Sequence, residues 1–218
     1  MRIAIFANTP AQIHFFKNIA RILESRSHQI EFLIRDYRES VMVADLLGIK
    51  YSIYSYGQSH KIIGSIGGFP NRILKSLKIL RIFKPDIILG TGLYDTYVSL
   101  ILGKPCIEFA DSEPLINPIF LAEIKMYMPF VDAIITPKLF NYDIGKNHIR
   151  VDSYKELAYL HRKYYAPNDD IFQYIGIEKG ESYIILRFNA FDAVHDAKIS
   201  GFSLEQKIRL LKELMRYS

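Results

Sequence analysis

A histidine near the start of a predicted helix is the first residue of this sequence that suggests proton transfer. His14 lies in a helix expected over residues 11–25, directly after the loop residues Asn8 and Thr9. The positive end of the helix dipole favours the neutral imidazole, which could act as a general base toward a hydroxyl group. The alternative is a hydrogen-bonded structural histidine. The loop lacks the G-x-G-x-x-G pattern, which argues against NAD or FAD binding, and we expect Asn8 and Thr9 to contact the substrate.

Two carboxylates follow a later strand, expected over residues 105–109. Asp111 and Glu113 are close enough in sequence to orient one sugar hydroxyl or to serve as acid and base. The alternative for Asp111 is the N-cap of the next helix.

A small-residue loop, Gly90-Thr91-Gly92, joins a predicted strand to a predicted helix. Such loops expose backbone N–H groups that can bind a phosphate or carboxylate. The alternative is a tight turn that needs glycine for steric reasons.

A polar loop near the end of the chain holds the last candidate residues. Arg187, His195 and Asp196 follow a strand expected over residues 182–188, and we expect them to bind substrate. His195 and Asp196 supply only two adjacent ligands, so they predict no metal site by themselves. The alternative is an ordinary solvated loop.

Alternating strand and helix patterns must position these loops. The expected strands are residues 2–7, 29–34, 50–56, 86–89, 105–109 and 132–136; the expected helices are 11–25, a helix from a capping-box pattern at 36–39 to Gly48, 71–84, one after Gly92, and 117–127, with a glycine-punctuated segment at 57–70. This order predicts an α/β fold, a doubly wound parallel sheet of the Rossmann-like kind. Ligands bind beyond the carboxyl ends of such strands, where the candidate loops lie.

Three parts of the chain differ in pattern. Residues 1–148 form the expected Rossmann-like domain, 149–180 a connecting helical segment, and 181–218 the first strand and helix of a second, incomplete α/β domain. One strand and one helix cannot bury both faces of a sheet. We therefore expect missing residues beyond 218, a partner chain or self-association, or a strand that joins the first sheet.

Composition excludes several classes of protein. The 218 residues include 28 Lys and Arg against 23 Asp and Glu, a net charge of +5 without long basic runs, which argues against nucleic acid as a partner. The single cysteine, Cys106, excludes internal disulfides. We expect a cytoplasmic protein, since neither a signal peptide nor a membrane span is recognisable. The basic helix 71–84 predicts a solvated face over a core, with peripheral membrane contact as the alternative.

Several of these segments resemble one known family. They are Asn8-Thr9-Pro10, Ile13-His14-Phe15-Phe16, Tyr154-Lys155-Glu156-Leu157-Ala158-Tyr159-Leu160, Arg187 with His195-Asp196, and Gly201-Phe202-Ser203-Leu204-Glu205. Together they look like the archaeal domain of unknown function family 354, which is similar to GT-B glycosyltransferases and to the UDP-GlcNAc 2-epimerase group. Two departures are Phe191, where the family pattern has Trp, and the lack of a complete second domain.

The resemblance implies a glycosyltransferase whose first domain holds the acceptor and whose second domain holds the nucleotide-sugar donor. His14 would be the base, Asp111 and Glu113 would contact the acceptor, and Arg187 would face phosphate. The nucleotide-sugar is a substrate, and neither a cofactor nor a metal is implied. A nucleotide-sugar 2-epimerase and a non-catalytic binding half that needs a partner chain are the alternatives.

Overall fold

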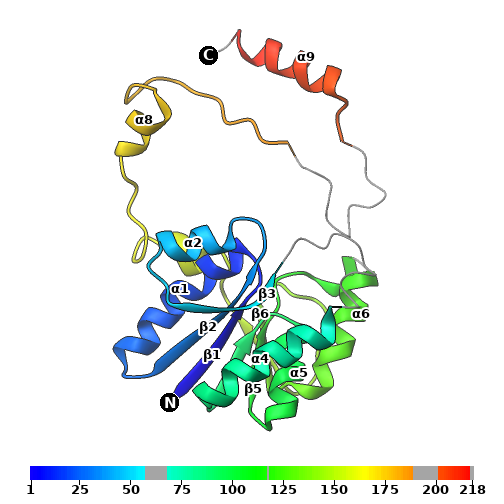
Figure 1. Cartoon of the computed structure of the whole chain (residues 1–218). Helices are drawn as coiled ribbons and strands as arrows, with labels where there is room; N and C mark the ends of the chain where they lie inside the picture. The colour runs from blue at the N-terminus through cyan, green and yellow to red at the C-terminus, as the bar shows by residue number, and fades with distance from the viewer. Residues whose placement is uncertain (57–67, 117, 189–200, 217–218) are drawn as a thin grey trace. The chain divides into compact units, whose positions relative to one another are not determined.

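A seven-stranded sheet forms the centre of the protein. The computed structural model describes residues 1–56, 68–116, 118–188 and 201–216. The strand order is β3-β2-β1-β4-β5-β6-β7, and all neighbouring strands are parallel (Figure 1). The strands are β1 (Arg2–Ala7), β2 (Gln29–Asp36), β3 (Tyr51–Tyr56), β4 (Ile87–Gly90), β5 (Cys106–Phe109), β6 (Ala133–Pro137) and β7 (His148–Val151). The predicted doubly wound α/β fold is confirmed.

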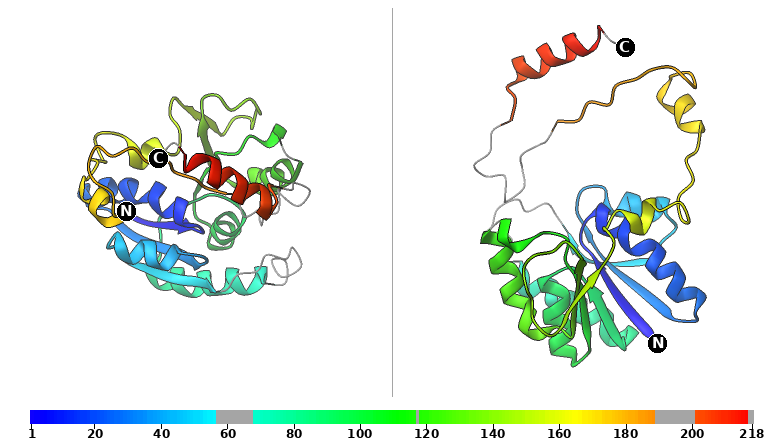
Figure 2. Two further views of the ribbon diagram at one scale, coloured as in Figure 1. Left: turned by 90° about the horizontal axis from the view of Figure 1, so that it is seen from above. Right: turned by 180° about the vertical axis from the view of Figure 1, so that it is seen from behind.

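Helices cover both faces of this sheet (Figures 1 and 2). One face carries α1 (Pro10–Ser25) and α2 (Ser40–Leu46), and the other carries α4 (Phe69–Phe83), α5 (Leu93–Leu102) and α6 (Pro118–Tyr127). Two short 3-10 helices, η1 (Pro114–Ile116) and η2 (Met128–Phe130), flank α6, and the short α7 (Leu157–Leu160) follows β7.

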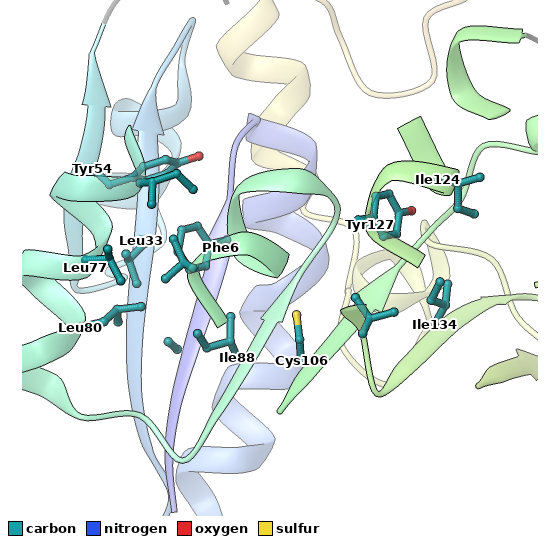
Figure 3. Close-up of a cluster of buried hydrophobic side chains, with 14 of the residues drawn as sticks. Phe6, Leu33, Tyr54, Leu77, Leu80, Ile88, Cys106, Ile124, Tyr127 and Ile134 are labelled. Carbon is teal, nitrogen blue, oxygen red and sulfur yellow. The ribbon is translucent and has the colours of Figure 1, made fainter. Parts of the chain in front are cut away.

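The apolar strands are buried on both sides, which explains their continuous hydrophobic runs. In β1, Ile3 and Ile5 face α1 and α2, whereas Ala4 and Phe6 face the other helical layer. Each face of the sheet thus has its own core cluster. Figure 3 shows the cluster on the face of α4, α5 and α6, in which Phe6 lies among side chains from the neighbouring strands and from α4. A core on each face holds the strand ends, and the loops after them, in fixed positions.

Two local predictions differ from the structure. The capping-box pattern at residues 36–39 is wrong, because β2 continues through Asp36 and α2 begins at Ser40 without a side-chain cap. β7 was not predicted. It is a short edge strand with mostly exposed side chains, so it has little of the apolar pattern by which buried strands are recognised.

The chain divides into two compact units after Tyr165. The second unit, residues 166–218, contains α8 (Asp170–Ile175) and α9 (Leu204–Leu214), and α9 begins at a capping box of Ser203 and Gln206. The buried strand expected over residues 182–188 does not form: these residues are exposed and have no strand assignment. A strand needs a hydrogen-bonded neighbour, and the described part of this unit offers none.

No helix within the described ranges combines the length and the apolar character needed to cross a lipid bilayer.

Two residues of α4 should contribute very differently to the free energy of unfolding, because one is in the core and the other is at the surface. Leu80 is fully buried, whereas Ile82 is 85% exposed. We expect Leu80→Ala to lower the free energy of unfolding by about 2–5 kcal/mol, because it leaves a cavity. Ile82→Ala is the matched control and should change it by less than about 0.5 kcal/mol. Urea unfolding followed by circular dichroism measures both, and equal losses would contradict this packing.

Candidate functional site

Three of the predicted loops lie next to one another at the carboxyl edge of the sheet. β1 pairs with β4, and β4 pairs with β5, so the loops at residues 8–9, 90–92 and 111–113 follow adjacent strands. The chain runs outward in one direction from β1 through β2 to β3, and in the other direction from β4 to β7. Open α/β sheets bind ligands where this direction reverses, which here lies between β1 and β4.

Asn8 and Thr9 hold the start of α1. Thr9 is the N-cap residue, and its hydroxyl oxygen accepts the Gln12 N–H over 3.3 Å. The Asn8 N–H donates to Gln12 Oε1 over 2.6 Å, and Asn8 Oδ1 accepts from the Tyr54 hydroxyl. That hydroxyl lies at the end of the core cluster near the strand arrowheads (Figure 3). Substrate contact by Asn8 and Thr9 stays a prediction.

His14 lies in the second turn of α1 and is half buried. Its ring centroid is 5.6 Å from that of Tyr159. Burial, followed by the nearby charge of Lys17, lowers the pKa of His14 below its usual value. The imidazole is therefore neutral at pH 7 and can accept a proton.

A segment returns from β7 to α1 along the carboxyl edge, and we call residues 152–160 the return segment. It begins beyond β7 and reaches α1, although β4, β5 and β6 lie between β7 and β1 in the sheet. Asn18 Nδ2 donates to Ala158 O over 2.8 Å, and Lys155 forms an ion pair with Asp111 after β5. The return segment is thus attached both to α1 and to the loop after β5.

Both predicted carboxylates have partners within the chain. Asp111 pairs with Lys155; burial opposes the charge of Lys155, but the hydrogen bond and charge of Asp111 outweigh it and raise the pKa of Lys155. Glu113 accepts the Asn141 N–H over 2.6 Å and the Tyr142 N–H over 3.2 Å. Asp111 therefore fixes the return segment, and Glu113 fixes the loop after β6.

The Gly90-Thr91-Gly92 loop binds a carboxylate of the chain itself. Asp95 Oδ2 accepts the Thr91 N–H over 2.6 Å and the Gly92 N–H over 3.2 Å. A Cβ at Gly90 would lie 1.4 Å from the same oxygen, so only glycine fits there. As expected, these N–H groups bind an anion, but that anion is the Asp95 carboxylate at the amino end of α5. A substrate role for the loop stays a prediction.

Asp95 and Glu108 form a fully buried carboxyl pair that the sequence analysis missed. Their side chains hydrogen-bond to each other, and Glu108 Oε1 lies 3.0 Å from the Thr96 hydroxyl and 3.2 Å from Cys106 Sγ. Burial raises the pKa of Asp95; burial and then the Asp95 charge raise the pKa of Glu108 well above its usual range. Two buried carboxyls in contact cannot both ionise, so the pair holds a proton at neutral pH.

The sequence contains one signal for this pair. Glu108 is the only charged residue of β5, a strand between two others, and a charge inside a buried strand requires a partner. Glu123 of α6 is a further carboxyl beside this edge. Its Oε1 lies next to Gly92, at 3.4 Å from the position that a Cβ on Gly92 would take. Burial raises the pKa of Glu123 as well.

The remaining predicted residues belong to the second unit, in which Arg187 is exposed. A substrate contact by Arg187 stays a prediction. His195 and Asp196 lie outside the described residues, as do Phe191 and most of the glycine-punctuated segment (57–67). In the described ranges, no three His, Cys, Asp or Glu side chains gather in a way that could hold a metal ion.

The basic helix has the predicted core-facing stripe on α4, with Ile73, Leu77 and Leu80 buried. Its cations are not all at the surface, however. Lys78 and Arg81 are exposed, whereas Arg72 is buried. Contact with a membrane surface stays a prediction.

The sequence matches no family model and no curated protein. Membership in the archaeal family of unknown function therefore stays a prediction. Solved structures do resemble the chain. The MurG structure from Acinetobacter baumannii has a TM-score of 0.52 at 10% identity, over 69% of this chain and 44% of that one. UDP-GlcNAc 2-epimerase from Neisseria meningitidis bound to UDP-GlcNAc has a TM-score of 0.52 at 14% identity, over 63% and 41%.

The spinosyn rhamnosyltransferase SpnG, solved with thymidine diphosphate, has a TM-score of 0.50 at 12% identity, over 67% of this chain and 48% of that one. The chain thus spans between 41% and 48% of the length of these three structures. The first unit shares their Rossmann-like fold. At these identities the likeness concerns the fold alone.

The buried carboxyl pair predicts a pH-dependent stability. Unfolded carboxyls titrate near pH 4. The folded pair keeps its proton to higher pH, because its pKa values are raised. The free energy of unfolding should therefore fall as the pH rises from about 4 through the raised folded-state pKa values.

Glu108→Gln tests this origin, since the amide can still donate to Asp95 but does not titrate. We expect the variant to be about 1–2 kcal/mol more stable than the unmodified protein at pH 8, with a smaller difference at pH 5. Urea unfolding at both pH values measures it. Glu24→Gln, on an exposed part of α1, is the control and should leave the pH dependence unchanged. Parallel stability curves for the unmodified protein and Glu108→Gln would rule the pair out as the cause.

Proposed function

We propose that this chain is the acceptor-side part of a GT-B-like glycosyltransferase, which transfers a sugar from a nucleotide-sugar to an acceptor hydroxyl. The observation that carries the proposal is a neutral histidine, His14, in the helix after β1, close to the reversal point of a Rossmann-like sheet. A neutral imidazole beside a ligand-binding edge suits the deprotonation of a hydroxyl. The likeness of the fold to the spinosyn rhamnosyltransferase SpnG supports this choice of reaction.

The reaction assigns a role to each element of the carboxyl edge. The acceptor oxygen attacks the anomeric carbon, the bond from that carbon to the phosphate oxygen breaks, and the acceptor proton passes to His14 Nδ1 or Nε2. Asp111 orients the acceptor, with Lys155 and Glu113 holding the surrounding loops. The leaving diphosphate requires positive charge, which we assign to Arg187. His195 and Asp196 are assigned to other donor-side contacts, such as hydrogen bonds to the sugar. Asn8, Thr9 and the Gly90–Gly92 loop are assigned to substrate binding.

The second unit belongs to this proposal as the beginning of the donor-side domain. Residues 181–218 would supply its first strand and helix. Since β7 and the return segment belong to the first unit, we assign residues 1–165 to the acceptor-side domain and 166–180 to the connecting segment. The exposed apolar side chains of Ile184, Ile185 and Leu186 support this, since they need a sheet neighbour to be buried.

A nucleotide-sugar 2-epimerase is the second candidate. It is favoured by the likeness to the Neisseria enzyme bound to UDP-GlcNAc, whose TM-score equals that of MurG. The buried acids near the carboxyl edge would suit proton transfer at a sugar carbon. Incubation with UDP-GlcNAc in the absence of an acceptor separates the two, because only an epimerase converts the sugar without a second substrate.

The transferase proposal predicts a specific loss in His14→Ala. Protein from its native source is incubated with radiolabelled nucleotide-sugars and an extract of its own cells, and both labelled product and released nucleoside diphosphate are measured. We expect His14→Ala to lower the transfer rate by about 10²–10⁴-fold, because the general base is lost. The rate of the unmodified protein should fall as the pH drops through the lowered pKa of His14, and stay level above it.

His28→Ala is the matched control, since His28 lies between α1 and β2 at the opposite edge of the sheet. It should keep the full rate. An unchanged rate in His14→Ala would remove His14 as the base. Epimerised sugar without transferred label would replace the transferase with the second candidate.

A further inference from the structure

Arg72 is a buried cation that has no acidic partner among the described residues. It is the fourth residue of α4 and only 7% exposed. An arginine side chain keeps its charge at every physiological pH, and a buried charge is normally paired with an opposite one. Its hydrogen-bond partner among the described residues is the hydroxyl of Tyr94, and its guanidinium lies 5.3 Å from the centroid of the same ring. No ion pair of Arg72 with a carboxylate occurs in that part of the chain.

The nearest buried acids do not fill this role. Asp95 already accepts two backbone N–H groups and shares a hydrogen bond with Glu108. The Arg72 charge also acts on Tyr54: burial and then the Asp95 charge raise the pKa of that hydroxyl, and the charges of Arg35 and then Arg72 oppose the rise. Because Tyr54 donates to Asn8 at the end of β1, the Arg72 charge lies at the carboxyl edge of the sheet.

The surroundings of the guanidinium favour an anion. Helical side chains lean toward the amino end of their helix, so Arg72 leans toward the first turn of α4. That helix begins at Phe69 after Gly68, and no side chain of the described residues caps it. Pro70 has no N–H and the Arg72 N–H donates to Gly68 O, so the first-turn N–H groups that the helix does not use itself are those of Phe69 and Asn71. Tyr94 lies in the first turn of α5, directly after the Gly90–Gly92 loop. A buried arginine, an uncapped helix start and a tyrosine hydroxyl therefore meet beside the reversal point of the sheet.

We propose that a phosphate or diphosphate group of a ligand binds here, held by the Arg72 guanidinium, the Tyr94 hydroxyl and the amino end of α4. Arginine binds phosphate oxygens through two N–H groups at once, and a helix start adds a positive partial charge. The anion supplies the negative charge that the described chain does not place beside Arg72. The site goes beyond the proposed function, since binding at it does not require sugar transfer. A nucleotide and a phosphorylated acceptor would both present this group.

Calorimetric titrations with inorganic pyrophosphate, UDP and hexyl phosphate test the site. We expect the unmodified protein to bind pyrophosphate, and Arg72→Met, which keeps an apolar side chain of similar length, to bind it at least tenfold more weakly. Arg72→Lys should lie between the two, because it keeps the charge but loses the paired N–H groups. Arg81→Met, on the exposed face of the same helix, is the matched control and should bind as the unmodified protein does.

Thermal unfolding without ligand separates binding from a structural role. Arg72→Met should keep or raise the melting temperature, since it removes an unpaired buried charge, whereas pyrophosphate should raise that of the unmodified protein. Tighter binding of UDP than of hexyl phosphate assigns the group to a nucleotide, and the reverse assigns it to an acceptor. The site is overturned if none of the three anions binds, if Arg72→Met binds pyrophosphate normally, or if Arg81→Met loses as much affinity. If Arg72→Met does not fold, Arg72→Lys decides by the same comparison.

Discussion

The buried carboxyl pair of Asp95 and Glu108 is the constraint on which the candidate site depends. Asp95 fixes the amino end of α5 by accepting the N–H groups of Thr91 and Gly92, and its contact with Glu108 ties that helix to β5. Gly90 can end β4 at this point only because it lacks a Cβ. A proton shared by the two acids makes the arrangement tolerable without water, since two negative charges in contact there would destabilise the fold.

The same principle of internal pairing extends along the carboxyl edge. Asp111 is neutralised by Lys155, and Glu113 is satisfied by two backbone N–H groups after β6. These contacts hold the loops and the return segment in place, so the first role of Asp111 and Glu113 is structural. The imidazole of His14 is neutral, and the buried guanidinium of Arg72 forms no ion pair with a described residue. The two proposals therefore rest on a base and a cation more than on the carboxylates.

Much of the fold follows from local sequence patterns. Continuous apolar runs such as residues 87–89 are recognisable because strands covered on both faces bury every side chain, and amphipathic spacing marks α1 and α4. β7 lacked such a pattern, being a short exposed edge strand. At residues 182–188, by contrast, a strand was predicted that does not form. Their apolar side chains favour a strand, but a strand forms only when a neighbour is present.

The sequence by itself determined the α/β class, the parallel sheet and the loops that lie at its carboxyl edge. Only the tertiary structure decided which residues meet there. Glu108 signals only that a charge in a buried strand needs a partner. That this partner is Asp95 of α5, and that Asp111 pairs with Lys155 44 residues later, has no local signal. Local patterns report burial and backbone preference along one element, whereas ion pairs and shared protons depend on distances between elements that are set when the two cores pack.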